Sequence, residues 1–215
     1  MVCPLFFLLS LVLFFPQHDS DARSVKRVMR PAVAGWKRVS GAGLSFQLPS
    51  NWKTVAITPT SFDKGVDTVF GGAKYADVRK EVRGIAKDGT IKIFGVETPI
   101  MGPGLNRTCL AAIVQEPPSA TLEEVVNFSL QQDESIKAPG TKPKAEYLTL
   151  KSGRTALITL EIKPANPASP NTVSFSYVSL ASSRMRLVTF SAPASDRIRI
   201  RRIADKAMST FQFIR

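Results

Sequence analysis

The feature that most constrains this fold is a run of four strand-like segments between Lys144 and Phe190. Within them apolar residues alternate with polar ones or form short continuous runs, as half-buried and fully buried strands do. Two connections, Lys151-Ser152-Gly153 and Ser182-Ser183, are short enough to join antiparallel neighbours directly. We therefore predict an antiparallel meander made of residues 147–150, 156–162, 173–180 and 185–190.

A helix is predicted to begin after Thr121, because Glu124 follows three residues later and the two can form a capping box. Apolar residues then recur at helical spacing at Leu122, Val125, Val126, Leu130 and Ile136. Asp133 falls on the same stripe. Because it lies in the last turn, where helices fray, we expect its side chain in solvent rather than in a buried functional site.

A second helix is predicted after Pro193, with Ser195 as its cap. Its apolar stripe consists of Ile200, Ile203, Ala204, Ala207, Met208 and Phe211. We expect this stripe to pack on the sheet.

The opposite face of that helix carries the candidate partner-binding or anion-binding residues, which are Arg199, Arg201, Arg202 and Lys206. On a helical wheel all four point away from the apolar stripe. An anionic partner could dock there. The alternative is a solvated face whose charges keep the protein soluble.

The N-terminal part of the domain begins with a predicted hairpin, in which residues 36–39 and 44–48 flank the turn Ser40-Gly41-Ala42-Gly43. Residues 53–89 give a weaker pattern, either a short helix over 77–87 or irregular strands. Two further strands are predicted over 90–96 and 108–114, the second with Cys109 buried as a small apolar side chain. Strands and helices together indicate the α+β class, an antiparallel sheet flanked by helices.

An apolar run, Leu5 to Phe15, precedes the domain and is too short to span a bilayer comfortably. It suits a signal peptide over residues 1–22, with small residues at Ser20 and Ala22 for cleavage after Ala22. We predict a basic arm over 23–35, one domain over 36–215, and export to the periplasm or the medium. An uncleaved leader that tethers the protein to the membrane is the alternative.

Cleavage would remove His18 and Cys3, which leaves no imidazole and only one thiol in the mature chain. Catalytic Ser-His-Asp and Cys-His arrangements are then excluded, and a zinc site would need nearly all its ligands from carboxylates. No phosphate-binding glycine motif occurs either. We predict a protein with no metal and no cofactor that is not an enzyme, with a histidine-free hydrolase using Asp, Glu, Ser or Lys as the alternative.

The formal net charge is +12, and cleavage would raise it further because Asp19 and Asp21 lie in the leader. This charge favours an acidic partner and is compatible with peripheral membrane contact. The sequence has no zinc-finger spacing, RNP-like run or GxxG clamp, which argues against nucleic acid as the partner. An electrostatic binder of anionic lipid or nucleic acid remains a second alternative.

The segment Gly43-Leu44-Ser45-Phe46-Gln47-Leu48-Pro49-Ser50-Asn51-Trp52 resembles the strand-Pro-x-x-Trp opening of PsbP-like domains, and Thr210-Phe211-Gln212-Phe213 resembles their C-terminal element. The resemblance implies an α/β/α sandwich in which Pro49 and Trp52 are core anchors. It also implies a non-enzymatic accessory or binding role. It assigns no functional residue to this chain. We therefore predict an exported accessory protein that acts through its surface on a protein or an acidic envelope component.

Overall fold

A computed structural model of the chain describes residues 34–57, 62–73, 76, 79–80, 83, 89–101, 105–164 and 169–214. The predicted leader and almost all of the basic arm lie outside these residues. The strands are β1 Trp36–Gly41, β2 Leu44–Pro49, β3 Trp52–Ala56, β4 Ile91–Glu97, β5 Thr108–Gln115, β6 Lys144–Leu150, β7 Gly153–Ile162, β8 Thr172–Ala181, β9 Arg184–Pro193 and β10 Gln212–Phe213. The helices are α2 Phe62–Val69, α4 Leu122–Asp133 and α5 Arg197–Ser209, with a short 3-10 helix, η3, at Ala194–Asp196.

Seven strands form one antiparallel sheet in the order β3-β4-β5-β9-β8-β7-β6. The predicted meander is confirmed, because β6, β7, β8 and β9 are neighbours in chain order. A three-stranded sheet, β1-β2-β10, lies beside it. The predicted hairpin is confirmed too. Its turn places Ala42 at φ 47° and Gly43 at φ 82°, the left-handed conformations that a two-residue hairpin turn requires.

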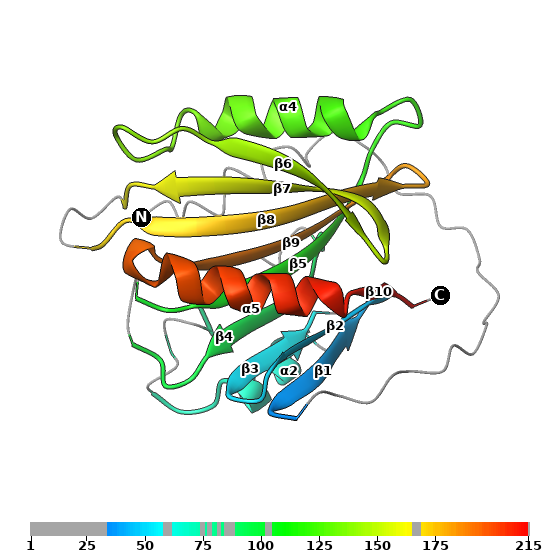
Figure 1. Cartoon of the computed structure of the whole chain (residues 1–215). Helices are drawn as coiled ribbons and strands as arrows, with labels where there is room; N and C mark the ends of the chain where they lie inside the picture. The colour runs from blue at the N-terminus through cyan, green and yellow to red at the C-terminus, as the bar shows by residue number, and fades with distance from the viewer. Residues whose placement is uncertain are drawn as a thin grey trace.

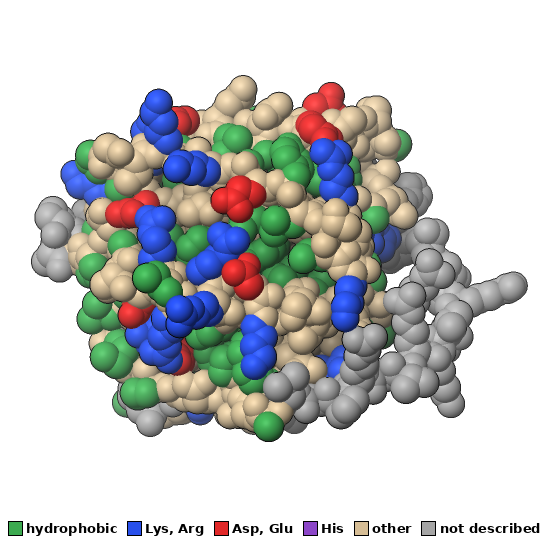
Figure 2. Space-filling view, in the orientation of Figure 1, with side chains coloured by type: hydrophobic (Ala, Val, Ile, Leu, Met, Phe, Trp, Pro, Cys, Tyr) green, Lys and Arg blue, Asp and Glu red, His purple; other side chains and the backbone are tan. Residues whose placement is uncertain are grey.

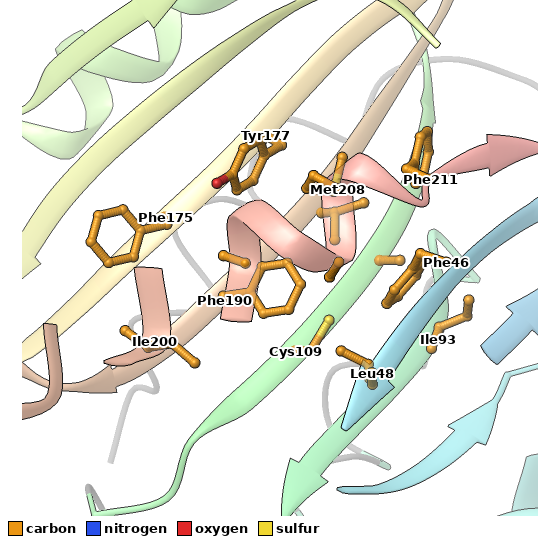
Figure 3. Close-up of a cluster of buried hydrophobic side chains, with 14 of the residues drawn as sticks. Phe46, Leu48, Ile93, Cys109, Phe175, Tyr177, Phe190, Ile200, Met208 and Phe211 are labelled. Carbon is orange, nitrogen blue, oxygen red and sulfur yellow. The ribbon is translucent and has the colours of Figure 1, made fainter. Parts of the chain in front are cut away.

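Helices cover both faces of the seven-stranded sheet, as the α/β/α prediction required. On one face α5 packs over β8, β9 and the hairpin strand β2 (Figure 1). Figure 3 shows the resulting core, where Phe46, Cys109, Phe190 and Met208 converge from β2, β5, β9 and α5. On the other face α4 packs against β6, β7 and β8, and α2 packs against β3. These helices bury a second apolar cluster.

Trp52 anchors the α5 side of the core, as the sequence predicted for a PsbP-like opening. It is fully buried and meets Phe190 edge-on, with ring centroids 6.5 Å apart. Gly95 on the neighbouring strand is closely packed, because a Cβ there would lie 3.2 Å from the Thr54 methyl group, which is tight, and 3.5 Å from the indole, which is an ordinary contact. A residue larger than glycine would crowd Thr54.

Several local predictions can be compared with the structure. The capping box of α4 is confirmed, since the Thr121 hydroxyl accepts from the Glu124 amide and the Glu124 carboxylate accepts from the Thr121 amide. The prediction of Ser195 as a helix cap was wrong, because Ser195 lies inside η3 and α5 begins after Asp196 with no side-chain cap bond.

The predicted helix over 77–87 lies mostly outside the described residues, although residues 79, 80 and 83 are helical. Within the described residues, no helix is both long and apolar enough to cross a bilayer.

Candidate partner-binding surface

The predicted binding residues lie on α5, whose inner face holds it firmly on the sheet. Ile200, Ala204, Ala207 and Met208 are buried there, so the stripe prediction is confirmed. Figure 2 shows the outer surface of this side, where basic, acidic and apolar side chains are intermixed. The surface is therefore mixed in character rather than uniformly basic.

Arg199 lies on one flank of α5 and is paired with Glu97 of β4. The Glu97 side chain is only 6% exposed, whereas that of Arg199 is 52% exposed. Glu97 also accepts hydrogen bonds from Arg107 at 2.6 Å and from the Asn51 amide at 3.0 Å. Arg199 thus helps to neutralise a buried carboxylate, and much of its charge is already used inside the fold.

Arg107 ties the same cluster to the start of α5. Its guanidinium contacts Glu97 and also lies 2.5 Å from the carboxylate of Asp196, the residue before the helix. Burial opposes its charge, but hydrogen bonds and charge contacts with Glu97 and Asp196 outweigh burial and raise the pKa of Arg107. Arg107, just before β5, is consequently held beside the N-terminal end of α5.

Arg201 lies on the opposite flank of the helix, in a second polar cluster. It donates to both carboxylate oxygens of Asp205, at 3.0 and 2.9 Å, and stacks over the Phe175 ring at 5.4 Å. The buried Tyr177 hydroxyl also donates to Asp205, at 2.5 Å. Burial, followed by the contact with Asp205, raises the pKa of Tyr177, so this hydroxyl keeps its proton. Arg201 is therefore committed to the fold as well.

The other two predicted residues, Arg202 and Lys206, lie on the outer face of α5. Arg202 is exposed and makes no ion pair with any other residue that the structure describes. Lys206 lies over the Trp36 ring, with its amine 4.5 Å from the centroid. A cation on an aromatic face keeps its charge and can still meet an anion. Of the four predicted residues, these two retain the charge that a partner could use.

Ile198 belongs to this surface and was missed by the sequence analysis. It is 70% exposed, the largest value among the exposed large apolar side chains of the described residues. Its neighbours along the helix are Arg197, paired with Glu161, and Arg199. The sequence did contain a signal for an exposed Ile198, because it is a β-branched apolar residue on the charged side of the helical wheel, where helix propensity favours Ala, Lys or Arg.

Asp133 contradicts the expectation that it would reach solvent. It is only 4% exposed and lies under α4 in a small recess, which is lined also by Ser129, Ile158, Ser176, Val178, Met185 and Leu187. Its carboxylate makes no hydrogen bond or ion pair with another described residue. Burial raises its pKa to about 6. No second ionisable group lines this recess, so the arrangement lacks an acid-base pair.

Cys109 is fully buried, as predicted, and burial raises the pKa of its thiol well above the usual range. A thiol of this kind is a poor nucleophile. Among the described residues, no three His, Cys, Asp or Glu side chains gather closely enough to hold a metal ion.

Comparisons with known proteins give similarity in structure but not in sequence. No family model matches the sequence, and a search of curated proteins gives no significant match. LpqN of Mycobacterium tuberculosis, described as involved in cell envelope biogenesis, matches with a TM-score of 0.52 and 10% identity, over 84% of this chain and 91% of its own.

Two further solved structures match with TM-scores below one half. Cyanobacterial PsbP (CyanoP) from Synechocystis sp. PCC 6803 has a TM-score of 0.47 and 13% identity, over 88% of this chain and 98% of its own. The Saccharomyces cerevisiae Ran-binding protein Mog1p has a TM-score of 0.48 and 12% identity, over 83% of this chain and 95% of its own. The match to LpqN shows a shared α+β fold, and at 10% identity the fold is all that it establishes.

Proposed function

We propose that this protein is an exported, non-enzymatic accessory protein that binds an envelope partner through the outer face of α5. The observation that carries the proposal is the setting of Ile198, a 70% exposed apolar side chain among arginines on a helix anchored by its other face. Interfaces combine exposed apolar anchors with arginine in this way. Export itself rests on the leader sequence.

The clusters on the two flanks of α5 support a binding role. Glu97 and Asp205 fix the arginines beside them, so the surface holds its shape before a partner arrives. Such preorganisation lowers the ordering cost of association. The same ion pairs reduce the free positive charge, which disfavours a purely electrostatic binder of lipid or nucleic acid.

The alternative of a histidine-free hydrolase would place its chemistry at Asp133, the buried carboxylate with a raised pKa. General acid-base catalysis needs a second group that can exchange a proton with substrate or nucleophile. The two hydroxyls in the recess are engaged elsewhere, since Ser129 donates to the Val125 carbonyl and Ser176 shares a hydrogen bond with Thr189. This geometry favours the binding role over the enzymatic one.

Affinity capture of the tagged protein from its native envelope fraction tests the proposal. The test variant combines Ile198→Asp with Arg202→Ala, because neither side chain forms an ion pair in the described structure. The matched control combines Phe128→Asp on α4, where Phe128 is 42% exposed, with Lys151→Ala. Both variants change the charge equally. The proposal predicts loss of capture only in the α5 variant, and equal capture by both would refute it.

A further inference from the structure

Two more exposed apolar side chains lie between β4 and β5, where Met101 is exposed by 60% and Leu105 by 42%. Both are close in sequence or structure to Arg107, which pairs with Asp196 at the start of α5, since the Met101 amide donates to the side chain of Asn106, the neighbour of Arg107. Figure 1 shows the loop and the N-terminal end of α5 together at one end of the molecule. Three of the six exposed large apolar side chains among the described residues thus come from adjoining segments.

Basic side chains surround this region, which we name the Ile198 tip and define as Met101, Leu105 and Ile198. Arg202, one turn after Ile198, is exposed and makes no ion pair with another described residue, so its guanidinium can bind phosphate oxygens. Arg197 and Arg199, on either side of Ile198, have side chains that are 45% and 52% exposed. Both are already paired with carboxylates, but each guanidinium carries five donors, so their unused N–H groups can add to the contact with phosphate.

The tip protrudes instead of forming a groove. A side chain exposed by 70% stands clear of its neighbours, and the recess that holds Asp133 lies elsewhere, under α4. Anchor residues of protein interfaces usually fill pockets, and a protruding aliphatic tip needs a pocket in its partner. A bilayer supplies such an environment everywhere, because aliphatic side chains enter the boundary between headgroups and acyl chains.

Resting on the proposed function, we infer that the envelope partner is an anionic lipid bilayer, into which the Ile198 tip inserts while the arginines around it bind lipid phosphates. Apolar insertion and charge attraction each give weak membrane binding, and stable attachment takes the two together. The chain has both at the same end.

Binding to vesicles measures the first part of this inference. The exported protein, with its N-terminus established by mass spectrometry, is sedimented with vesicles of phosphatidylcholine alone or of phosphatidylcholine with phosphatidylglycerol. We expect binding to the anionic vesicles only, weakening several-fold as salt is raised. Ile198→Ser with Met101→Ser should weaken it at least about tenfold at unchanged charge. Phe128→Ser, which removes a ring that is 42% exposed from α4, should have no effect.

A site-resolved measurement remains decisive if the leader also binds lipid. Ile198→Cys, Met101→Cys and Phe128→Cys are each introduced into a Cys3→Ser background and labelled with an environment-sensitive fluorophore, so that a retained leader offers no thiol, and the buried Cys109 does not compete for the label. We expect a blue shift on anionic vesicles from labels at 198 and 101 but not at 128. No shift at 198 and 101, or the same shift at 128, would overturn the inference.

A third outcome separates the inference from the proposed function. If Ile198→Asp with Arg202→Ala abolishes capture of an envelope protein while vesicles neither bind the chain nor shift the labels, the α5 surface is a protein-binding site. The lipid assignment is then wrong and the accessory function stands. If neither capture nor vesicle binding depends on these residues, both are wrong.

Discussion

Each face of the seven-stranded sheet buries a carboxylate, and the surroundings of the two carboxylates are opposite in character. On the α5 side Glu97 is surrounded by Arg107, Arg199 and Asn51, so each of its oxygens has a partner. On the α4 side Asp133 is buried among apolar side chains and hydroxyls and has no partner in the described structure. Its position at the C-terminal end of a helix, where the dipole is negative, adds to the cost of its charge.

The comparison shows that burial alone does not determine what a charged group contributes. Glu97 joins β4, the β4–β5 loop and α5, and removing it should loosen the candidate binding surface. Asp133 connects no elements, and removing its charge should make the protein more stable. Ion pairs hold α5 in place, whereas α4 packs on the sheet although it buries an unpaired carboxylate.

The largest effect expected from this comparison is that of Glu97→Ala. It leaves Arg107, only 18% exposed, without its main partner, and should lower the free energy of unfolding by about 3 kcal/mol. Urea denaturation measures the change. The control is Glu123→Ala, because Glu123 pairs with Arg154 at 2.5 Å with both side chains about half exposed. That variant should cost less than about 1 kcal/mol. Equal costs would show that the Glu97 cluster is no stronger than a surface pair.

Asp133→Asn should act in the opposite direction, raising stability by about 2 kcal/mol at pH 7. A carboxyl whose pKa is raised to about 6 binds its proton more tightly in the folded protein than in the unfolded chain. The buried carboxyl therefore costs almost no stability below about pH 4. As the pH rises through about 6, the folded protein has to hold a buried charge, and the free energy of unfolding falls relative to that of the Asn variant.

Thermal unfolding of the wild type and of Asp133→Asn between pH 4 and pH 8 tests this sign. The difference between the two should be small at pH 4 and should grow until it levels off above pH 7. Glu134→Gln changes an exposed neighbour that pairs with Lys137 and provides the reference. An Asn variant less stable than the wild type at pH 7 would mean that the Asp133 carboxylate has a stabilising partner.

The sequence was sufficient where the signal was local. Period-two alternation located β6 to β9, and the Thr121–Glu124 pair located the start of α4. It was insufficient for β3 and α2, which lie in the region that gave the weakest pattern. The segment of α2 contains Gly65 and several β-branched residues, all poor helix formers, so tertiary packing must stabilise this helix.

The candidate site was predictable only in part, because its chemistry depends on contacts between distant residues. A helical wheel places Arg199 on α5 but cannot show Glu97, which is 102 positions away in sequence. It places Arg201 but not the Tyr177 hydroxyl that shares Asp205 with it. The error on Asp133 has the same origin, since only the packing of α4 on β7 and β8 shows that its last turn is covered.

Tyr177→Phe tests the second cluster of the α5 side and should have a smaller effect than Glu97→Ala. It removes the 2.5 Å hydrogen bond to Asp205 but leaves Arg201 bonded to both carboxylate oxygens. Loss of one hydrogen bond to a charged acceptor should cost about 1.5 kcal/mol in urea denaturation. Tyr147→Phe, at a tyrosine 44% exposed on β6, should leave stability unchanged. Equal values for both tyrosines would mean that Asp205 contributes nothing through Tyr177.

The smallest effect concerns how the two helices begin. The side chain of Thr121 caps α4, so Thr121→Ala should cost about 1 kcal/mol. Ser195→Ala should cost almost nothing, because Ser195 makes no cap bond and α5 is held at its start by Arg107 and Asp196. Urea denaturation of both variants compares a helix start fixed by a local cap with one fixed by a tertiary ion pair. If Ser195→Ala costs as much as Thr121→Ala, α5 has a side-chain cap after all, and the contact between Arg107 and Asp196 is not what fixes its start.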